Sequence, residues 1–176
     1  MAKFGVGQSA TRLEDQRLLT GHGSYTSDIN LDNQAYGVVV RSPYAHARFS
    51  TIDKSAALVS PGVLAVYTAK DIKSAGLNPL PFSLAFKENI DGTQVFSPTR
   101  DVLAIDVVRH VGNPVAFVVA ETHAQARDAA ELVDIDYEPL PATADTGGAI
   151  ERAAPQVWEG APNNVAFKWE AGNQKL

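Results

Sequence analysis

The chain has 176 residues, 45% hydrophobic and 20% charged, which suffices to bury the core of one soluble domain without disulfides. Its 15 Lys and Arg against 20 Asp and Glu leave a formal net charge of −5. Nucleic acid is therefore not an expected partner, because binding to phosphates relies on clustered cationic side chains. The absence of cysteine excludes disulfides, thiolate metal sites, iron–sulfur ligation and a cysteine nucleophile in this chain.

The beginning of the chain predicts a flexible arm followed by a short helix. Small residues are frequent over 1–10, which indicates the arm. Thr11 and Glu14 have the spacing of a capping box, in which each side chain satisfies a backbone N–H of the other residue. This spacing predicts a helix over 11–19, which ends before Gly21.

The next part of the chain alternates strands with short helices. A β-branched run predicts a strand over 35–40, and alternating polarity predicts another over 47–52. Asp53 is placed to cap a short helix. A third strand is predicted over 63–67, closed by a helical turn over 69–72.

Residues 74–100 have a different composition. Pro79 and Pro81 remove backbone donors and restrict their neighbours, so neither a regular helix nor a central strand is predicted there. A long irregular connection in a compact domain is typical of a functional loop or of one that packs against a partner.

The clearest secondary-structure signals follow this loop. Strands are predicted at 107–108 and 114–120 and, because they flank Gly112-Asn113, they are expected to pair around a turn. The second is apolar at every position, which predicts a central strand. Thr122 and Gln125 have the spacing of a second capping box, which predicts a helix from there to about Val133 with one apolar stripe. A strand over 134–138 has one solvated face.

The end of the chain is expected to carry little regular structure. One helical turn is predicted near 146–152, and from Pro155 the chain is expected to thin into Trp158, Trp169 and polar residues. The whole order predicts an α+β fold, a mixed sheet with helices packed on it.

The sequence predicts neither a membrane span nor a secretion signal. The apolar run at 114–120 is far shorter than the roughly 20 residues that a spanning helix needs. The first residues lack the apolar stretch of a signal peptide, so a cytoplasmic location is expected.

No active site is recognisable from residue types and spacing alone. None of the four histidines stands in a metal-binding pattern; His123 is expected at the surface and His46 in a buried, hydrogen-bonded position. Asp134, Asp136 and Glu138 are expected to form the solvated face of a strand. The glycine pairs do not follow strands as they do in nucleotide-binding loops.

Five ordered strings over about residues 8–165 nevertheless resemble one family. They are Arg12-Leu13-Glu14-Asp15 with the following run to Gly21, Arg41-Ser42-Pro43-Tyr44-Ala45-His46-Ala47, the spaced pattern from Gly62 to Asp71, Val111-Gly112-Asn113-Pro114-Val115-Ala116, and Tyr137-Glu138 with Leu140-Pro141. Together they resemble the N-terminal a/b hammerhead domain of the molybdenum hydroxylases. That family includes xanthine dehydrogenases, aldehyde oxidases and carbon monoxide dehydrogenase-type large subunits.

The resemblance implies an arm over 1–10, a hammerhead domain over 11–162 and, over 163–176, the start of a linker toward a molybdenum-binding domain. It implies a non-catalytic part of an oxidoreductase, with no catalytic, cofactor-binding or metal-binding residue here, so the isolated chain is expected to be inactive. The complete enzyme is expected to hold molybdopterin with molybdenum, iron–sulfur clusters and FAD. The implied partners are the molybdenum-binding domains of the same large subunit, an iron–sulfur subunit and a flavin subunit.

Given this resemblance, two sets of residues are candidates for a functional or a structural role. Phe82, Phe86 and Phe96 lie on the loop over 77–98 and are expected to line a substrate funnel; the alternative is that they pack beneath the loop. Arg41, Pro43 and His46 are expected to form a structural corner between two strands. The alternative to an enzyme domain is a free-standing protein-interaction or assembly module of the same fold.

Overall fold

The computed structural model describes residues 5, 7, 11–81, 84 and 87–172. These residues belong to two compact units, one up to Gln34 and the other from Ala35 onward. The first unit contains helix α1 (Asp15–Leu19) and the 3₁₀ turn η1 (Thr26–Asp28). The predicted capping box does not form, because α1 begins only after Glu14, whose carboxylate accepts a hydrogen bond from Arg17 at 3.2 Å.

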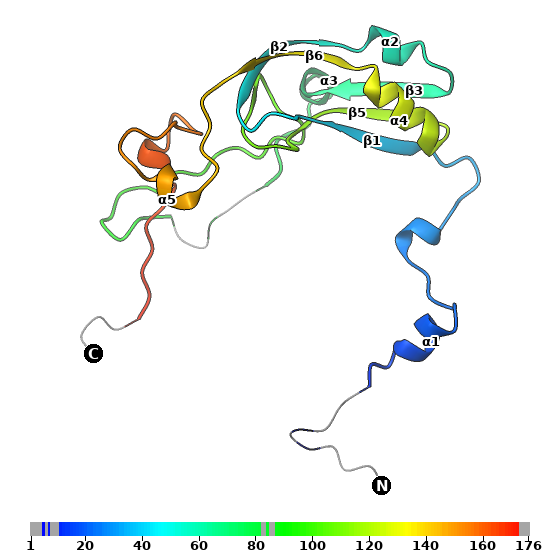
Figure 1. The fold of residues 1–176 in the computed structure, drawn as a ribbon, viewed down its shortest axis with the longest axis horizontal. Helices are drawn as coiled ribbons and strands as arrows, with labels where there is room; N and C mark the ends of the chain where they lie inside the picture. Colours follow the sequence, from blue (N-terminus) through cyan, green and yellow to red (C-terminus); the bar gives the residue numbers. More distant parts are fainter. Residues whose placement is uncertain (1–4, 6, 8–10, 82–83, 85–86, 173–176) are drawn as a thin grey trace. The chain divides into compact units, whose positions relative to one another are not determined.

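The strands of the second unit form two antiparallel sheets of three strands each (Figure 1). Sheet A has the order β1 (Tyr36–Arg41), β5 (Pro114–Ala120), β3 (Val63–Thr68). Sheet B has the order β4 (Val107–Val108), β2 (Ala47–Asp53), β6 (Asp134–Pro139). The α+β class is confirmed and β5 is central as expected, but two antiparallel sheets replace the mixed sheet predicted.

The predicted pairing of β4 with β5 is wrong, because the two strands belong to different sheets. Strand β4 pairs with Ala47 and Arg48 of β2, whereas β5 pairs with β1 and β3. Gly112 has a φ of +83°, but the turn that it makes leads from one sheet into the other. Successive strands alternate between the two sheets, so the chain changes sheet at each of the five connections between these strands. Two of these crossings, between β1 and β2 and between β4 and β5, contain no helix in their described residues.

Short helices pack mainly against the strands of sheet A. Helix α2 (Ser55–Leu58) follows Asp53, whose carboxylate accepts from the Ser55 N–H at 2.9 Å, and α3 (Ala69–Ser74) follows β3. Helix α4 (His123–Glu131) begins as predicted, since the Thr122 hydroxyl accepts from the Gln125 N–H. The remaining helices are α5 (Thr146–Ala149) and the 3₁₀ turn η2 (Pro162–Asn164).

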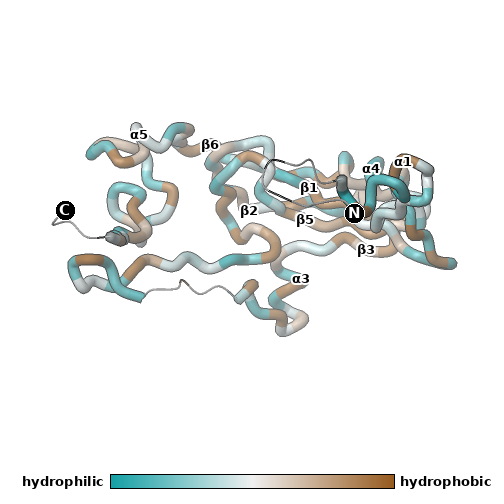
Figure 2. The backbone as a smooth tube through the Cα atoms, turned by 90° about the horizontal axis from the view of Figure 1, so that it is seen from below, coloured by the Kyte–Doolittle hydropathy of each residue, from teal (hydrophilic) through white to brown (hydrophobic). Residues whose placement is uncertain are grey.

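The core consists of two clusters, and hydrophobic residues follow the strands of sheet A in Figure 2. In the first cluster the small side chain of Ala129 lets α4 approach Ala116 and Val118 of β5 closely. The second cluster lies between the sheets, around Phe49. Partly buried Ile52 and Ile135 pack against both clusters, so they link the two halves of the core.

The loop between α3 and β4 is irregular, as predicted. In its described part the only strand-like pairings are two isolated bridges, Leu80 with Arg100 and Glu88 with Gln94. The described residues contain no helix long and apolar enough to cross a bilayer.

The segment after Pro155 was expected to thin out, but it folds back along this loop (Figure 1). The Phe96 N–H donates to the Ala166 carbonyl at 2.9 Å, and the Ile90 N–H donates to the Lys168 carbonyl at 3.1 Å. These hydrogen bonds satisfy backbone groups of both irregular segments in their described parts. The predicted domain boundaries at residues 10 and 162 stay predictions.

Candidate functional site

The predicted corner residues lie where the chain passes from sheet A into sheet B. Ser42 and the turn at Gly112-Asn113 join the two crossings: the Ser42 N–H donates to the Asn113 carbonyl at 3.0 Å, and the Gly112 N–H donates to the Ser42 carbonyl at 2.8 Å. Arg41 Nη1 adds a bond to the Gly112 carbonyl at 2.9 Å. Exposed Pro43 lies in the same crossing.

His46 fastens the other end of this crossing. Its Nδ1 lies 2.9 Å from the Pro141 carbonyl, and because a carbonyl only accepts, Nδ1 carries the proton. The His46 carbonyl in turn accepts from the Leu140 N–H at 2.9 Å. His46 is half-buried and hydrogen-bonded, whereas His123 is exposed at the start of α4, as expected. Hydrogen bonds therefore hold the corner at both of its ends.

Phe96 is the one described member of the predicted funnel-lining set, since Phe82 and Phe86 lie outside the described residues. Its ring centroid lies 6.1 Å from that of Trp158, at an interplanar angle of 55°. The same ring covers Gly160 so closely that a Cβ atom there would collide with it. Phe96 thus packs between its own loop and the C-terminal segment.

Arg109 completes this aromatic cluster from the crossing between β4 and β5. Its guanidinium carbon lies 3.7 Å from the centroid of Trp158, and its Nε donates to the Val157 carbonyl at 3.1 Å. Burial lowers the pKa of Arg109, while the charges of Glu159 and Asp101 oppose that shift, so the guanidinium stays charged. The corner and the aromatic cluster are therefore connected through one short crossing.

Arg109, Trp158 and Asn164 are structural residues that were not predicted from the sequence. The Asn164 side chain donates to the Ala149 and Pro155 carbonyls, both at 2.9 Å, and accepts from the Val157 N–H at 2.8 Å. Asn164 has a φ of +56°, a conformation that asparagine tolerates well. Consecutive asparagines after Pro162 were the available signal for a turn.

The acidic groups do not assemble a metal site in the described residues. Asp134, Asp136 and Glu138 are exposed along β6, which confirms the predicted solvated face. No group of three or more His, Asp or Glu that could hold a metal ion occurs in the described part of the chain. Neither the corner nor the aromatic cluster offers a nucleophile paired with a base.

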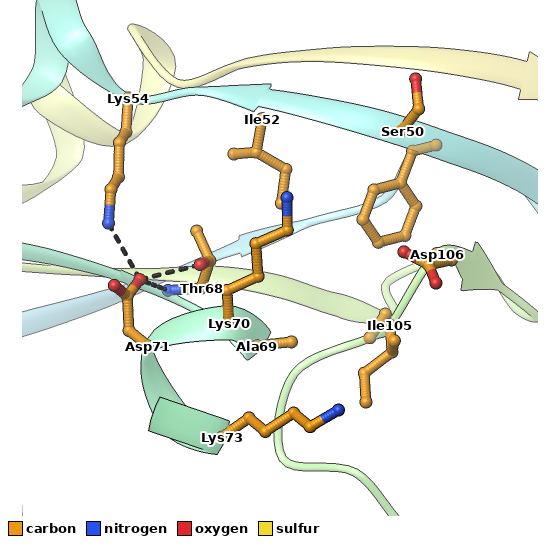
Figure 3. Close-up of a pocket in the computed structure, with 12 residues that line it drawn as sticks. Ser50, Ile52, Lys54, Thr68, Ala69, Lys70, Asp71, Lys73, Ile105 and Asp106 are labelled. Carbon is orange, nitrogen blue, oxygen red and sulfur yellow. Dashed lines mark hydrogen bonds and ion pairs between the residues drawn. The ribbon is translucent and has the colours of Figure 1, made fainter. Parts of the chain in front are cut away.

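One carboxylate is held in a distinct environment, at the start of α3 (Figure 3). Asp71 Oδ2 accepts from the Thr68 N–H at 2.7 Å and from the Thr68 hydroxyl at 2.8 Å. Lys54 Nζ donates to the same oxygen at 2.9 Å and to the Val66 carbonyl at 2.9 Å. Chiefly the Lys54 bond, followed by the Thr68 hydroxyl bond, lowers the pKa of Asp71 from 3.8 to about 2.

Replacing Asp71 with Asn is expected to lower the free energy of unfolding by about 1 kcal/mol near neutral pH, because Lys54 loses a partly exposed ionic partner. The folded-state pKa of about 2 lies below the ordinary 3.8. The carboxylate therefore stabilises the fold above pH 3.8 and loses this effect as pH falls through about 2. Urea unfolding between about pH 6 and pH 2 should show the difference between Asp71→Asn and wild type shrink; a constant difference would contradict this. Asp136→Asn on exposed β6 is the control.

Most of the chain matches one family of known sequences. The family described as aldehyde oxidase and xanthine dehydrogenase, a/b hammerhead domain, matches residues 20–141. The chain is 40% identical to the nicotine 6-hydroxylase large subunit of Paenarthrobacter nicotinovorans, over 94% of this chain and 19% of that protein. It is 38% identical to the carbon monoxide dehydrogenase large chain of Afipia carboxidovorans, over 97% of this chain and 21% of that protein.

A solved structure agrees with these sequence matches. The aldehyde oxidoreductase of Desulfovibrio gigas superposes with a TM-score of 0.74 at 32% identity, covering 89% of this chain and 17% of that chain. The chain thus spans about a fifth of the length of the relatives that it matches.

Proposed function

Because the chain belongs to the aldehyde oxidase and xanthine dehydrogenase a/b hammerhead family, we propose that it serves as the N-terminal structural domain of a molybdenum hydroxylase large subunit. The observation that carries this proposal is the match over 94% of the chain to only 19% of a large subunit. In such a protein most residues lie outside the matched region, and we propose that the reacting groups lie there.

The cofactors of the complete enzyme are accordingly assigned to other segments and subunits. Iron–sulfur clusters are held by Cys thiolates, and this chain has no Cys. The described residues contain no group of three or more His, Asp or Glu that could hold a metal ion. We therefore propose no catalytic step for this chain, and we assign molybdopterin with molybdenum, iron–sulfur clusters and FAD to the remaining parts of the enzyme.

The proposed role of this domain is to support subunit contacts and one wall of the substrate funnel. The names "large subunit" and "large chain" of the relatives favour an assembly with further subunits, for which an iron–sulfur subunit and a flavin subunit are proposed. The loop over 77–98 is the proposed wall. Its support is the packing of Phe96 against Trp158, which would hold the loop in a defined position.

The isolated 176-residue chain is expected to bind no molybdenum and to oxidise neither an aldehyde, xanthine nor carbon monoxide in a dye-coupled assay. The reason is that no reacting group is assigned to it. Metal analysis and the three assays check this, with the complete large subunit and its co-purifying subunits as the control. Turnover and bound molybdenum in the isolated chain would refute a purely structural role. The module hypothesis would be favoured if the coding sequence stops at Leu176.

A further inference from the structure

One strand edge in sheet B is open beside an apolar groove. Strand β4 covers only Ala47 and Arg48 of β2, and on the same side the Phe49 N–H donates to the Asp106 carbonyl at 2.9 Å. Beyond that point no described strand pairs with this edge of β2. An open edge offers backbone donors and acceptors to an added extended segment.

A cavity of about 440 Å³ lies between this edge and α3 (Figure 3). Its apolar lining includes the nearly buried side chains of Phe49 and Ala104, the partly buried Ile52, and Ile105, which is 47% exposed. An occupant would therefore gain most by placing a large apolar side chain against this surface.

The charges around the groove specify the occupant further. Lys54 is already bound to Asp71, so that pair contributes no net charge. Lys70 and Lys73 on α3 are exposed and have no carboxylate partner among the described residues. In Figure 3 the Lys70 side chain reaches across the groove toward Ile52, and the Lys73 side chain points toward Ile105. Two unpaired ammonium groups beside an apolar surface favour a carboxylate on the occupant.

Asp106 lies on the wall of the groove opposite α3, so only the α3 side favours a carboxylate of the occupant. Its exposed carboxylate would repel an acid placed there, so the acidic side chain of the occupant must face α3. With only two unpaired cations in the groove and a net charge of −5 over the chain, a polyanion such as nucleic acid fits poorly.

Building on the proposed function, we propose that this groove binds an extended segment of the remaining large subunit, one that carries a carboxylate beside a large apolar side chain. The segment would add to the open edge of β2, with its carboxylate between Lys70 and Lys73. The relatives are about five times longer than this chain. A segment of the same polypeptide also has a high effective concentration at the groove.

The test uses the complete large subunit with its co-purifying subunits. Photo-reactive p-benzoylphenylalanine replaces Ile105 in one variant and exposed Val59 in a matched control. Mass spectrometry of the cross-linked peptides should show, for Ile105 alone, a peptide of the same large subunit with Asp or Glu next to a large apolar residue. A cross-link from Ile105 only to another subunit or to a second copy would overturn the proposal, as would no cross-link at all.

Charge reversal gives a second, independent measurement. Lys70→Glu with Lys73→Glu is expected to reduce the Ile105 cross-link about tenfold or more, because like charges would then face each other. The matched control Lys87→Glu changes an exposed lysine that does not line the groove, and should leave the yield unchanged. Equal yields in both variants would overturn the role of the lysines.

The proposed function is tested separately, by measuring the molybdenum content and the dye-coupled oxidation activity of the unsubstituted protein. If the protein contains molybdenum and oxidises its substrate but Ile105 forms no cross-link, only the groove proposal is refuted. If the unsubstituted protein has neither molybdenum nor oxidation activity, the proposed function is refuted.

Discussion

Val118→Asp is expected to abolish cooperative folding of the second unit. Val118 is fully buried on the central strand of sheet A and packs in one cluster with Val66 and Ala129. An ionised carboxylate at this position would have neither water nor a cation beside it, and a protonated one would still lack a hydrogen-bond partner. The cost of several kcal/mol is comparable with the whole stability of a domain, about 5–15 kcal/mol.

Circular dichroism with urea unfolding measures this effect directly. Val59→Asp is the matched control because Val59 is 83% exposed, and the same change there is expected to alter the free energy of unfolding by less than about 0.5 kcal/mol. A Val118→Asp chain that unfolds cooperatively at the wild-type urea midpoint would contradict the assignment of β5 to the core.

Several elements were predictable from a local signal in the sequence, although the spacing of Thr11 and Glu14 did not produce the expected cap. The unbroken apolar run of β5 predicted a central strand, and Thr122 with Gln125 predicted the start of α4. Both are confirmed, because a cap or a run of buried residues depends on neighbours in the sequence. The hammerhead resemblance is likewise confirmed by the match over 20–141.

The arrangement of these elements depends on distant residues, and the strand pairing predicted from the sequence is wrong for this reason. Val107 and Val108 were recognised as a strand, yet their partner is β2 instead of the strand that follows them. The turn at Gly112-Asn113 looked like a hairpin because its residues permit one, but its backbone bonds to Ser42 decide the path. Local preference specifies that the chain turns, and distant hydrogen bonds specify where it goes.

The same difference between local signals and distant contacts explains which site residues were predictable from the sequence. Arg41 and His46 could be placed at a corner because Ser42-Pro43 breaks the strand locally. The contact of Arg109 with Trp158 could not be foreseen, since neither residue carries a local sign of the other. Trp158 lies in a segment that was expected to thin out, whereas its ring packs against Phe96.

Phe96→Ala is expected to lower the free energy of unfolding by about 2–3 kcal/mol, because it leaves a cavity between the loop and Trp158. Urea unfolding of Phe96→Ala, Trp158→Ala and the double variant measures their coupling, which should be about 1 kcal/mol for a ring pair. Phe96→Leu, which keeps most of the apolar volume, is expected to recover part of the loss. Additive effects of the two alanine substitutions would contradict the packing of the two rings.

If Phe96 lines the substrate funnel, its replacement should also change substrate preference, which packing alone does not predict. In the complete enzyme, Phe96→Ala must then change the ratio of kcat/KM between a bulky and a small substrate, since only contacts with the substrate discriminate between the two. A variant of lower stability with an unchanged ratio would assign Phe96 to packing beneath the loop. Phe96→Ala and Trp158→Ala both loosen the same aromatic cluster, but only Phe96→Ala removes a residue of the proposed wall. A change in the kcat/KM ratio in Phe96→Ala that is absent from Trp158→Ala would therefore place the Phe96 ring against the substrate.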